Sequence, residues 1–248
     1  QEQTKDAGEL NSDIKVAEVQ AALELCRHGT APGHDAIPYE VLQALPKEAL
    51  EELTAIYQGM LRVHHMPQNW KCGQVSMLYK QDGAATNCSN YRGITLLPTM
   101  GEVFERVLLA RMAAYVEKHN ILHENQNGFR AKRSCEQHVF ALQQTLEHNP
   151  NALAVFVDVR KAYPTVFRDG LFLKLAQAGV TGDIWQTLRH MYQGLTSKVA
   201  VGAETSEEYG VENGLMEGAI LSPFLYTLFI DGLARKLEAS GYGCRLGR

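Results

Sequence analysis

The stretch Leu153–Val166, LAVFVDVRKAYPTV, places a single carboxylate in an otherwise apolar run. Six of the seven residues from Leu153 to Val159 are apolar, which predicts a buried β-strand with Asp158 near its end. A buried carboxylate is costly unless it is hydrogen-bonded or bound to a cation. At a strand end that opens on a cleft, Asp158 could hold Mg²⁺ together with substrate phosphates. It could equally cap the following turn, where aspartate is common.

The bulk composition is that of an ordinary globular protein. The chain has 248 residues, of which 45% are hydrophobic and 21% charged, so we expect one large domain or two small ones. The five cysteines and nine histidines show no metal-ligand spacing, which favours reduced thiols in a reducing compartment. No apolar run is long enough for a membrane span. Because the chain begins with Gln1 rather than Met, we expect it to be a piece of a longer protein.

The net charge of −4 is unevenly distributed along the chain. Residues 1–59 carry a net charge of −7, residues 60–135 carry +5, and residues 136–248 carry −2. A basic middle segment could meet phosphate groups. On charge alone we favour a solvated surface of uneven charge, because nucleic-acid enzymes are usually basic overall.

Apolar spacing and turn residues predict a mixed order of helices and strands. Helices are predicted over 14–26, 39–45, 48–61, 100–120, 138–148, 170–179, 183–194 and 222–241. Strands are predicted over 73–80, 152–159, 197–202 and 207–214, with a short apolar run over 94–98. From Leu153 onward, the order strand, helices, two strands, helix gives most of a split βαβ (ferredoxin-like) unit.

Two segments of the C-terminal half carry a family resemblance. FVDVRKAYPTV resembles motif A of the reverse transcriptases of non-LTR (LINE-type) retrotransposons, and Phe156, Asp158, Ala162 and Tyr163 match that pattern. NGLMEGAILSPFLYTLFIDGL resembles motif B of the same family, and its matching residues are Gly214, Gly218, Ser222 and Pro223.

The resemblance extends over nearly the whole chain, from about Ser12 to the end. KCGQVSMLYKQDG, NYRGITLLPTMGEVFERVLLARM and ENQNGFRAKRS resemble the fingers motifs of these enzymes, and GTAPGHDAIPYEVL resembles the lead-in before the fingers. Any one of these motifs alone is weakly specific, whereas five of them in the family's order are highly specific.

The resemblance implies an α+β fold built as the fingers and partial palm of a right-hand polymerase, with an incomplete ferredoxin-like βαββαβ unit. The implied division is a helical N-terminal extension over 1–70, fingers over 71–150, and a partial palm with motifs A and B over 151–248. The implied activity is that of an RNA-directed DNA polymerase, with an RNA template, a DNA primer and deoxynucleotides as partners and Mg²⁺ as cofactor.

The resemblance also assigns roles to motif A. Asp158 would be the catalytic carboxylate that binds both metal ions of a two-metal site. Tyr163 would lie under the sugar of the incoming nucleotide, where its ring would clash with a 2′-hydroxyl. The alternative for Tyr163 is an ordinary core aromatic residue.

Further nucleotide-binding residues are implied in the fingers. Arg130 would grip the incoming triphosphate, since a guanidinium can bind phosphate bidentately. Lys80 and Arg92 flank the QDGAATNCSN loop, where contact with template or triphosphate and simple surface solubility are both open. For Lys132 and Arg133 a solvated basic loop is an equal alternative.

Motif B contributes Gly218 and Glu217 to the implied nucleotide site. Glycines here would let the backbone approach the template and nucleotide closely. Glu217 stands where the family pattern has glutamine, so an acceptor replaces a group that also donates. Pro164 stands where the family usually has Asp or Asn, and proline removes a backbone donor.

The third motif of the family, an aromatic-x-Asp-Asp hairpin, is expected beyond Arg248, and no Asp-Asp pair occurs in the chain. One carboxylate cannot assemble a two-metal site, so the fragment alone is expected to be inactive. The alternative function is a degenerate or domesticated domain that serves as a structural subunit with protein assembly partners. The resemblance implies a nuclear or cytoplasmic location.

Overall fold

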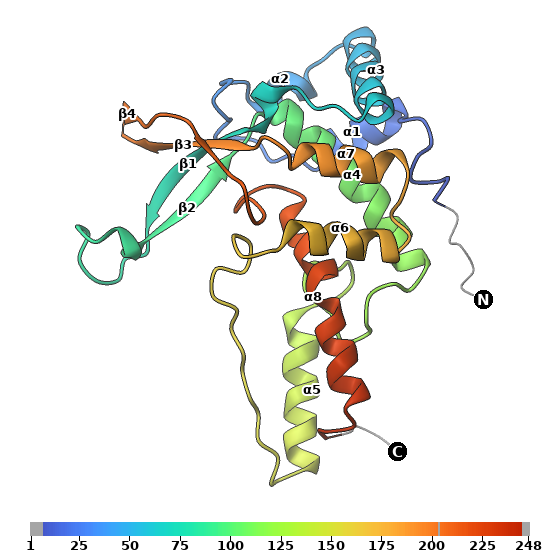
Figure 1. Ribbon diagram of the computed structural model, residues 1–248, viewed down its shortest axis with the longest axis vertical. Helices are drawn as coiled ribbons and strands as arrows, with labels where there is room; N and C mark the ends of the chain where they lie inside the picture. Colours follow the sequence, from blue (N-terminus) through green and yellow to red (C-terminus); the bar gives the residue numbers. More distant parts are fainter. Residues whose placement is uncertain (1–6, 203, 245–248) are drawn as a thin grey trace.

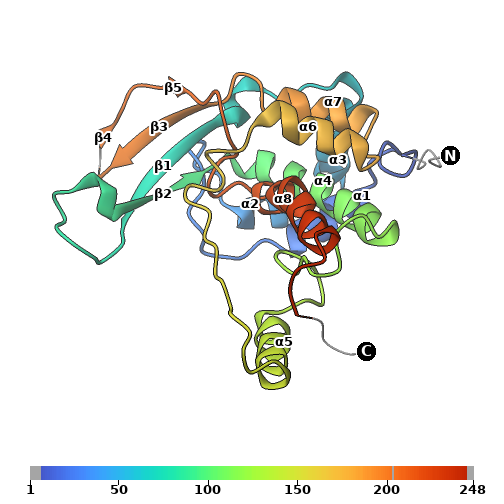
Figure 2. The ribbon, with the colours of Figure 1, turned by 60° about the horizontal axis from the view of Figure 1, so that its bottom comes forward.

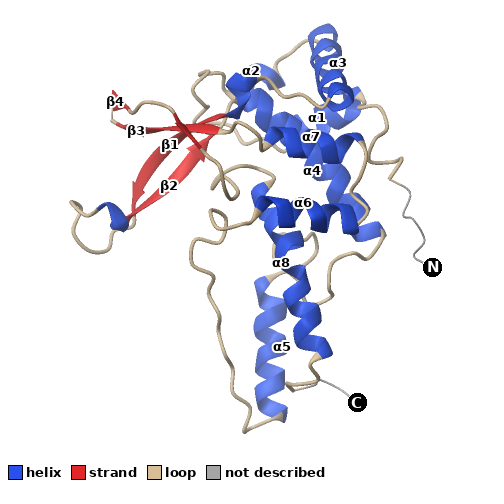
Figure 3. Ribbon diagram, viewed as in Figure 1, coloured by secondary structure: helices blue, strands red, loops and turns tan. Residues whose placement is uncertain are grey.

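The computed structural model describes residues 7–202 and 204–244 of the chain, with one sheet beside a larger helical body (Figure 1, Figure 3). The helices are α1 (Val16–Glu24), α2 (Tyr39–Gln43), α3 (Lys47–Val63), α4 (Thr99–Lys118), α5 (Cys135–His148), α6 (Arg168–Gln177), α7 (Asp183–Met191) and α8 (Ser222–Ala239). The strands are β1 (Cys72–Tyr79), β2 (Tyr91–Leu96), β3 (Thr196–Val201), β4 (Glu204–Thr205) and β5 (Tyr209–Gly210). Short 3₁₀ turns, η1 (Gln68–Lys71) and η2 (Cys88–Asn90), precede β1 and β2.

The sheet joins segments that are distant in the sequence. Its strand order is β2-β1-β3-β4, and β5 pairs with β3. β1 and β2 form an antiparallel hairpin, whereas β1 and β3 run parallel, with Cys72 opposite Thr196. The sheet therefore ties the middle of the chain to its C-terminal third, and the mixed α and β architecture expected from the sequence is confirmed at this level.

The helical body has one hydrophobic core, to which all the described helices except α5 contribute buried residues. α4 buries Val103, Val107, Leu108 and Met112 on one face. From α3, the ring of Tyr57 lies 5.2 Å from that of Phe104 between centroids. The core takes residues from all three segments of the predicted 1–70, 71–150 and 151–248 division, whose ends at 1–6 and 245–248 lie outside the described residues.

The predicted strand over 152–159 is wrong for this structure. The segment is irregular, and Leu153 and Phe156 are 92% and 84% exposed. None of the strands in the described part of the chain pairs with it, so its backbone groups have no ladder of hydrogen bonds to join. The segment is apolar, as its composition indicates, but no other part of the described chain covers its side chains.

The neighbouring helix α5 is also poorly packed. It has no buried residue, although Val139 and Phe140 are large and apolar. In Figure 1 it overlaps the lower part of α8, but the turned view of Figure 2 separates the two. α5 and the segment 153–159 therefore project together from the core. Among the described helices, none is both long and apolar enough to cross a membrane.

Candidate active site

The two segments that resemble motifs A and B lie side by side through backbone hydrogen bonds. The Gly214 N–H donates to the Val166 carbonyl at 3.1 Å, and the Leu215 N–H donates to the Tyr163 carbonyl at 2.8 Å. Gly214 has φ of +74°, and a Cβ atom there would lie 2.3 Å from the carbonyl oxygen of Pro164. Only glycine accommodates both conditions, so this residue sets the contact between the two segments.

The next part of the same loop is attached to the sheet. The Thr95 N–H on β2 donates to the carbonyl of Glu217 at 2.9 Å. Gly218 follows with φ of +106°, and a Cβ atom there would lie 2.5 Å from the Thr95 carbonyl oxygen. The structure places the Gly218 backbone against strand β2, and its predicted approach to template and nucleotide stays a prediction.

Tyr226 of α8 contacts the aromatic residue predicted for motif A and is influenced by its acid. The rings of Tyr163 and Tyr226 meet edge to face, with centroids 5.5 Å apart. Burial raises the pKa of Tyr226, and the nearby Asp158 carboxylate raises it further. Burial also raises the pKa of Tyr163, with smaller contributions from Tyr226 and Glu217. Asp158 is therefore within electrostatic range of Tyr226, and Glu217 is within range of Tyr163.

Tyr226 was missed by the sequence reasoning. It lies one turn after Ser222 in a helix that reads as an apolar core element, SPFLYTLF, so no polar pattern singles it out. The available signal was its spacing from the motif B residues, since positions four apart share a helix face.

The donor set at Asp158 fits one ligand of a metal ion but not a complete site. No group of three or more His, Cys, Asp or Glu side chains in the described segments could hold a metal ion. Asp183 is paired with His64 at 2.8 Å, and Asp231 accepts from the His123 backbone at 2.6 Å. A single carboxylate suits Mg²⁺ only when substrate phosphates, water or further acids complete the shell.

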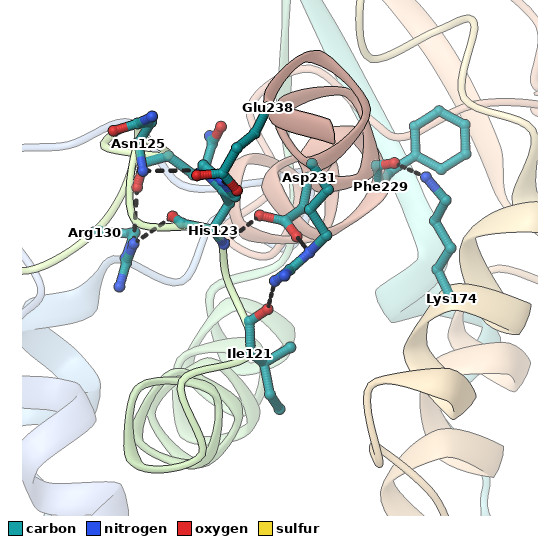
Figure 4. Close-up of polar contacts among 10 residues, drawn as sticks. Ile121, His123, Asn125, Arg130, Lys174, Phe229, Asp231 and Glu238 are labelled. Atoms are coloured by element: carbon teal, nitrogen blue, oxygen red, sulfur yellow. Dashed lines mark hydrogen bonds and ion pairs between the residues drawn. The ribbon is translucent and has the colours of Figure 1, made fainter. Parts of the chain in front are cut away.

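The guanidinium of Arg130 is hydrogen-bonded to other residues of the protein in this structure (Figure 4). Its Nε and Nη2 atoms donate to the two carboxylate oxygens of Glu117 at 2.8 and 2.9 Å. Nη1 donates to the carbonyls of His123 and Gln126, both at 3.0 Å, and only 7% of the side chain is exposed. A triphosphate would have to displace Glu117 to reach this guanidinium, so its nucleotide-binding role stays a prediction.

The Arg130 cluster continues into α8 and fixes the chain that leaves α4. Asp231 accepts from both the His123 N–H and Arg235 Nε, the latter at 2.9 Å. His123 Nδ1 accepts from the Asn125 N–H at 3.1 Å, which leaves Nε2 as the donor to Glu238 at 2.9 Å. Figure 4 shows these side chains converging between the turn after α4 and helix α8.

We expect Arg130→Ala to lower the free energy of unfolding by about 2 kcal/mol, because it removes four hydrogen bonds that involve a charged group. The matched control is Arg133→Ala, whose ion-pair partner Glu124 is 77% exposed. That substitution should change stability by less than about 0.5 kcal/mol. Urea denaturation of both variants measures the difference, and equal losses would contradict the structural role of Arg130.

The remaining predicted contacts lie on the β1–β2 hairpin and the basic turn. Lys80 Nζ donates to the Ser89 carbonyl at 2.9 Å and thereby closes the loop between the two strands. Arg92 lies on β2 opposite Leu78 of β1. Lys132 has a left-handed backbone with φ of +62° in the turn before α5. The structure gives these residues local positions without testing a nucleotide contact.

Comparison with known proteins gives a consistent family assignment. The family described as "Reverse transcriptase (RNA-dependent DNA polymerase)" matches residues 78–245. The chain is 30% identical over 250 residues to the Drosophila melanogaster protein named "Probable RNA-directed DNA polymerase from transposon X-element", covering 98% of this chain and 27% of that protein. It is 26% identical to the "RNA-directed DNA polymerase from mobile element jockey" of Drosophila melanogaster, covering 90% of this chain and 25% of that protein.

The chain thus spans about a quarter of the length of these curated relatives. Among solved structures, a chain of a "Partial Cas6-RT-Cas1--Cas2 complex" aligns with a TM-score of 0.47 and 15% identity. That alignment covers 93% of this chain and 35% of the other.

Proposed function

The chain belongs to the reverse transcriptase family, and on that premise we propose that it supplies the fingers and the first part of the palm of an RNA-directed DNA polymerase of the LINE type. The observation that carries the proposal is the meeting of motif A with motif B. Two backbone hydrogen bonds join them at Tyr163 and Val166, the rings of Tyr163 and Tyr226 are in contact, and the Asp158 carboxylate is near enough to raise the pKa of Tyr226.

Asp158 would contribute the first metal-binding carboxylate of this polymerase. Mg²⁺, when bound, supplies the charge that stabilises the attacking and leaving oxygens of nucleotidyl transfer. The other carboxylates would come from residues beyond those described, in keeping with the small share of the relatives that the chain spans. The exposed apolar segment 153–159 would then pair with strands from the same region, which would complete the ferredoxin-like palm.

The proposed substrates are an RNA template, a DNA primer and deoxynucleoside triphosphates. The positively charged segment 60–135 would face phosphate groups, as its net charge of +5 allows. Glu217 would direct its backbone rather than its carboxylate toward the sheet, since its carbonyl accepts from Thr95. A glutamate in place of the usual glutamine is therefore compatible with a template site that the loop backbone forms.

The direct test is primer extension by the full-length protein on an RNA template, with a DNA primer, dNTPs and Mg²⁺. We expect templated elongation that depends on each added dNTP. A soluble, folded full-length protein that never extends a primer under these conditions would instead favour a structural role for the domain.

We expect Tyr163→Val to lower the preference for deoxynucleotides over ribonucleotides by about ten- to a hundredfold, because a smaller side chain no longer clashes with a 2′-hydroxyl. The ratio of kcat/KM for dCTP and CTP, which differ only at the 2′ position, measures this preference. Tyr163→Phe is the matched control, since it keeps the ring that packs against Tyr226 and should keep the discrimination. Unchanged discrimination in Tyr163→Val would exclude the steric role.

A further inference from the structure

A buried acid on α4 contacts the start of α8. Glu105 is only 7% exposed, and none of the ion pairs between described residues includes it. Its Oε2 atom accepts a hydrogen bond from the Leu221 N–H at 3.0 Å, and the Ile220 backbone also stabilises its charged form. Burying a carboxylate costs free energy unless hydrogen bonds replace its lost hydration. Here both backbone groups that stabilise it belong to the motif B loop.

The start of α8 needs a cap that its own residues do not provide. The N-cap residue is Leu221, which has no side-chain acceptor, and the helix begins at Ser222 and Pro223. The first backbone N–H groups of a helix lack partners within it, and the helix dipole favours negative charge there. The carboxylate of Glu105 supplies this acceptor from a different helix, so α4 determines where α8 begins.

Besides the hydrogen bond that Arg168 Nε donates to the Gly214 carbonyl at 2.8 Å, the same loop is attached at three places before α8. Gly214 and Leu215 bond to the motif A turn, Glu217 bonds to β2, and Leu221 bonds to Glu105. Gly218, whose backbone approaches Thr95, lies between the last two attachments. Releasing the Glu105 contact would therefore free the segment after Gly218 while leaving the motif A contact intact.

The surroundings of Glu105 control its charge. Burial raises its pKa to about 7, and the neighbouring Glu102 adds to the increase, while the Leu221 N–H and Arg106 oppose it. Glu105 also borders a cavity of about 20 Å³ with Lys71 of η1 and Tyr192 after α7. Lys71 donates to the His190 carbonyl at 2.8 Å rather than pairing with Glu105.

We infer that Glu105 is a positioning residue of the polymerase site, whose carboxylate holds the backbone of the motif B loop between Gly218 and Leu221 in the geometry that accepts the templated nucleotide. The inference rests on the proposed function. Glu105 acts through the loop and does not itself touch substrate. Its contact is strongest when the carboxylate is ionised, because a charged acceptor binds N–H groups more strongly than a neutral one.

The test compares Glu105→Gln with Glu102→Gln in the full-length protein. Glu102 is a half-buried acid on the same helix, but its carboxylate accepts from the Tyr39 hydroxyl instead of from the loop. We expect Glu105→Gln to lower kcat/KM for dNTP at pH 8 about tenfold and to abolish the fall in wild-type kcat/KM between pH 8 and pH 6. Glu102→Gln should keep a fall in kcat/KM but move its midpoint to lower pH, because the Glu102 charge no longer raises the pKa of Glu105. If Glu105→Gln retains that fall, or if both variants change it alike, the inference is wrong.

A second measurement does not depend on activity. Hydrogen exchange of the amides at 218–222, in the same proteins and at one pH near 8, should be about tenfold faster in Glu105→Gln than in wild type. Exchange at Gly214 and Leu215 should be unchanged, because their bonds go to the motif A turn. The positioning role would be overturned if exchange became faster throughout the chain, or if it did not become faster at 218–222. If wild type fails to extend primers while these amides respond as expected, the proposed function is lost but the Glu105 contact stands.

Discussion

Replacing Asp158 with asparagine in the full-length protein is expected to reduce primer extension at least about a thousandfold, which corresponds to about 4 kcal/mol of transition-state stabilisation. The amide keeps the size of the side chain but removes the negative charge that a divalent ion requires. Asp158 is exposed and is near Tyr226, so the substitution leaves the packing of the core unchanged. Single-turnover extension at saturating dNTP measures the loss at the chemical step.

The matched control is Asp169→Asn, an exposed aspartate in the first turn of α6. It carries the same chemical change eleven residues further along the chain and should keep extension within about twofold, since its contribution is limited to the helix dipole. Equal activities of wild type and Asp158→Asn, with a folded protein in both cases, would remove Asp158 from the chemistry.

The second large effect is expected from Gly214→Ala, which should destabilise the protein by about 3 kcal/mol. A Cβ atom at this position would lie 2.3 to 2.6 Å from three backbone atoms of Pro164, and φ of +74° is unfavourable for alanine. Because the obstacle is backbone, no side-chain rotation relieves it. The motif A turn and the motif B loop would have to separate, so extension should be lost together with stability.

The same change from glycine to alanine is expected to stabilise the protein at Gly59. Gly59 lies within α3, and a Cβ atom there would meet nothing within 4 Å. Alanine is the better helix former, so this variant should gain about 0.5 to 1 kcal/mol. Thermal or urea unfolding of both variants measures the two changes in stability. A neutral Gly214→Ala would show that the two motifs are not held together at this residue.

Local sequence signals predicted most of the fold. The long helix α4 and strand β1 follow from apolar periodicity, a property of neighbouring residues, whereas β2 was predicted only as a short apolar run over 94–98. The strand expected around Asp158 did not form, because a strand needs a partner and the composition of 153–159 cannot indicate whether one is present. The parallel pairing of β1 with β3 was not predicted for the same reason.

The site was predicted in part. Tyr163 contacts Tyr226 and is influenced by Glu217, and Asp158 influences Tyr226, while the nucleotide-binding and metal-binding roles of these residues stay predictions. Tyr226 and Glu105 were missed, because each reads as an ordinary helix residue and acquires its role only when another element is placed against it. Arg130 shows the reverse case, in which a motif residue is bound by Glu117, a partner distant enough in sequence to escape pattern reasoning.

The parallel register that places Cys72 opposite Thr196 has a consequence for biosynthesis. While the ribosome makes the residues between these two strands, β1 has only β2 beside it, and its other edge waits for roughly ten seconds at ordinary elongation rates. An edge left open for that time can recruit strands of other nascent chains. Translation that slows before residue 196 is therefore expected to increase aggregation of the newly made protein, and faster delivery of β3 to decrease it.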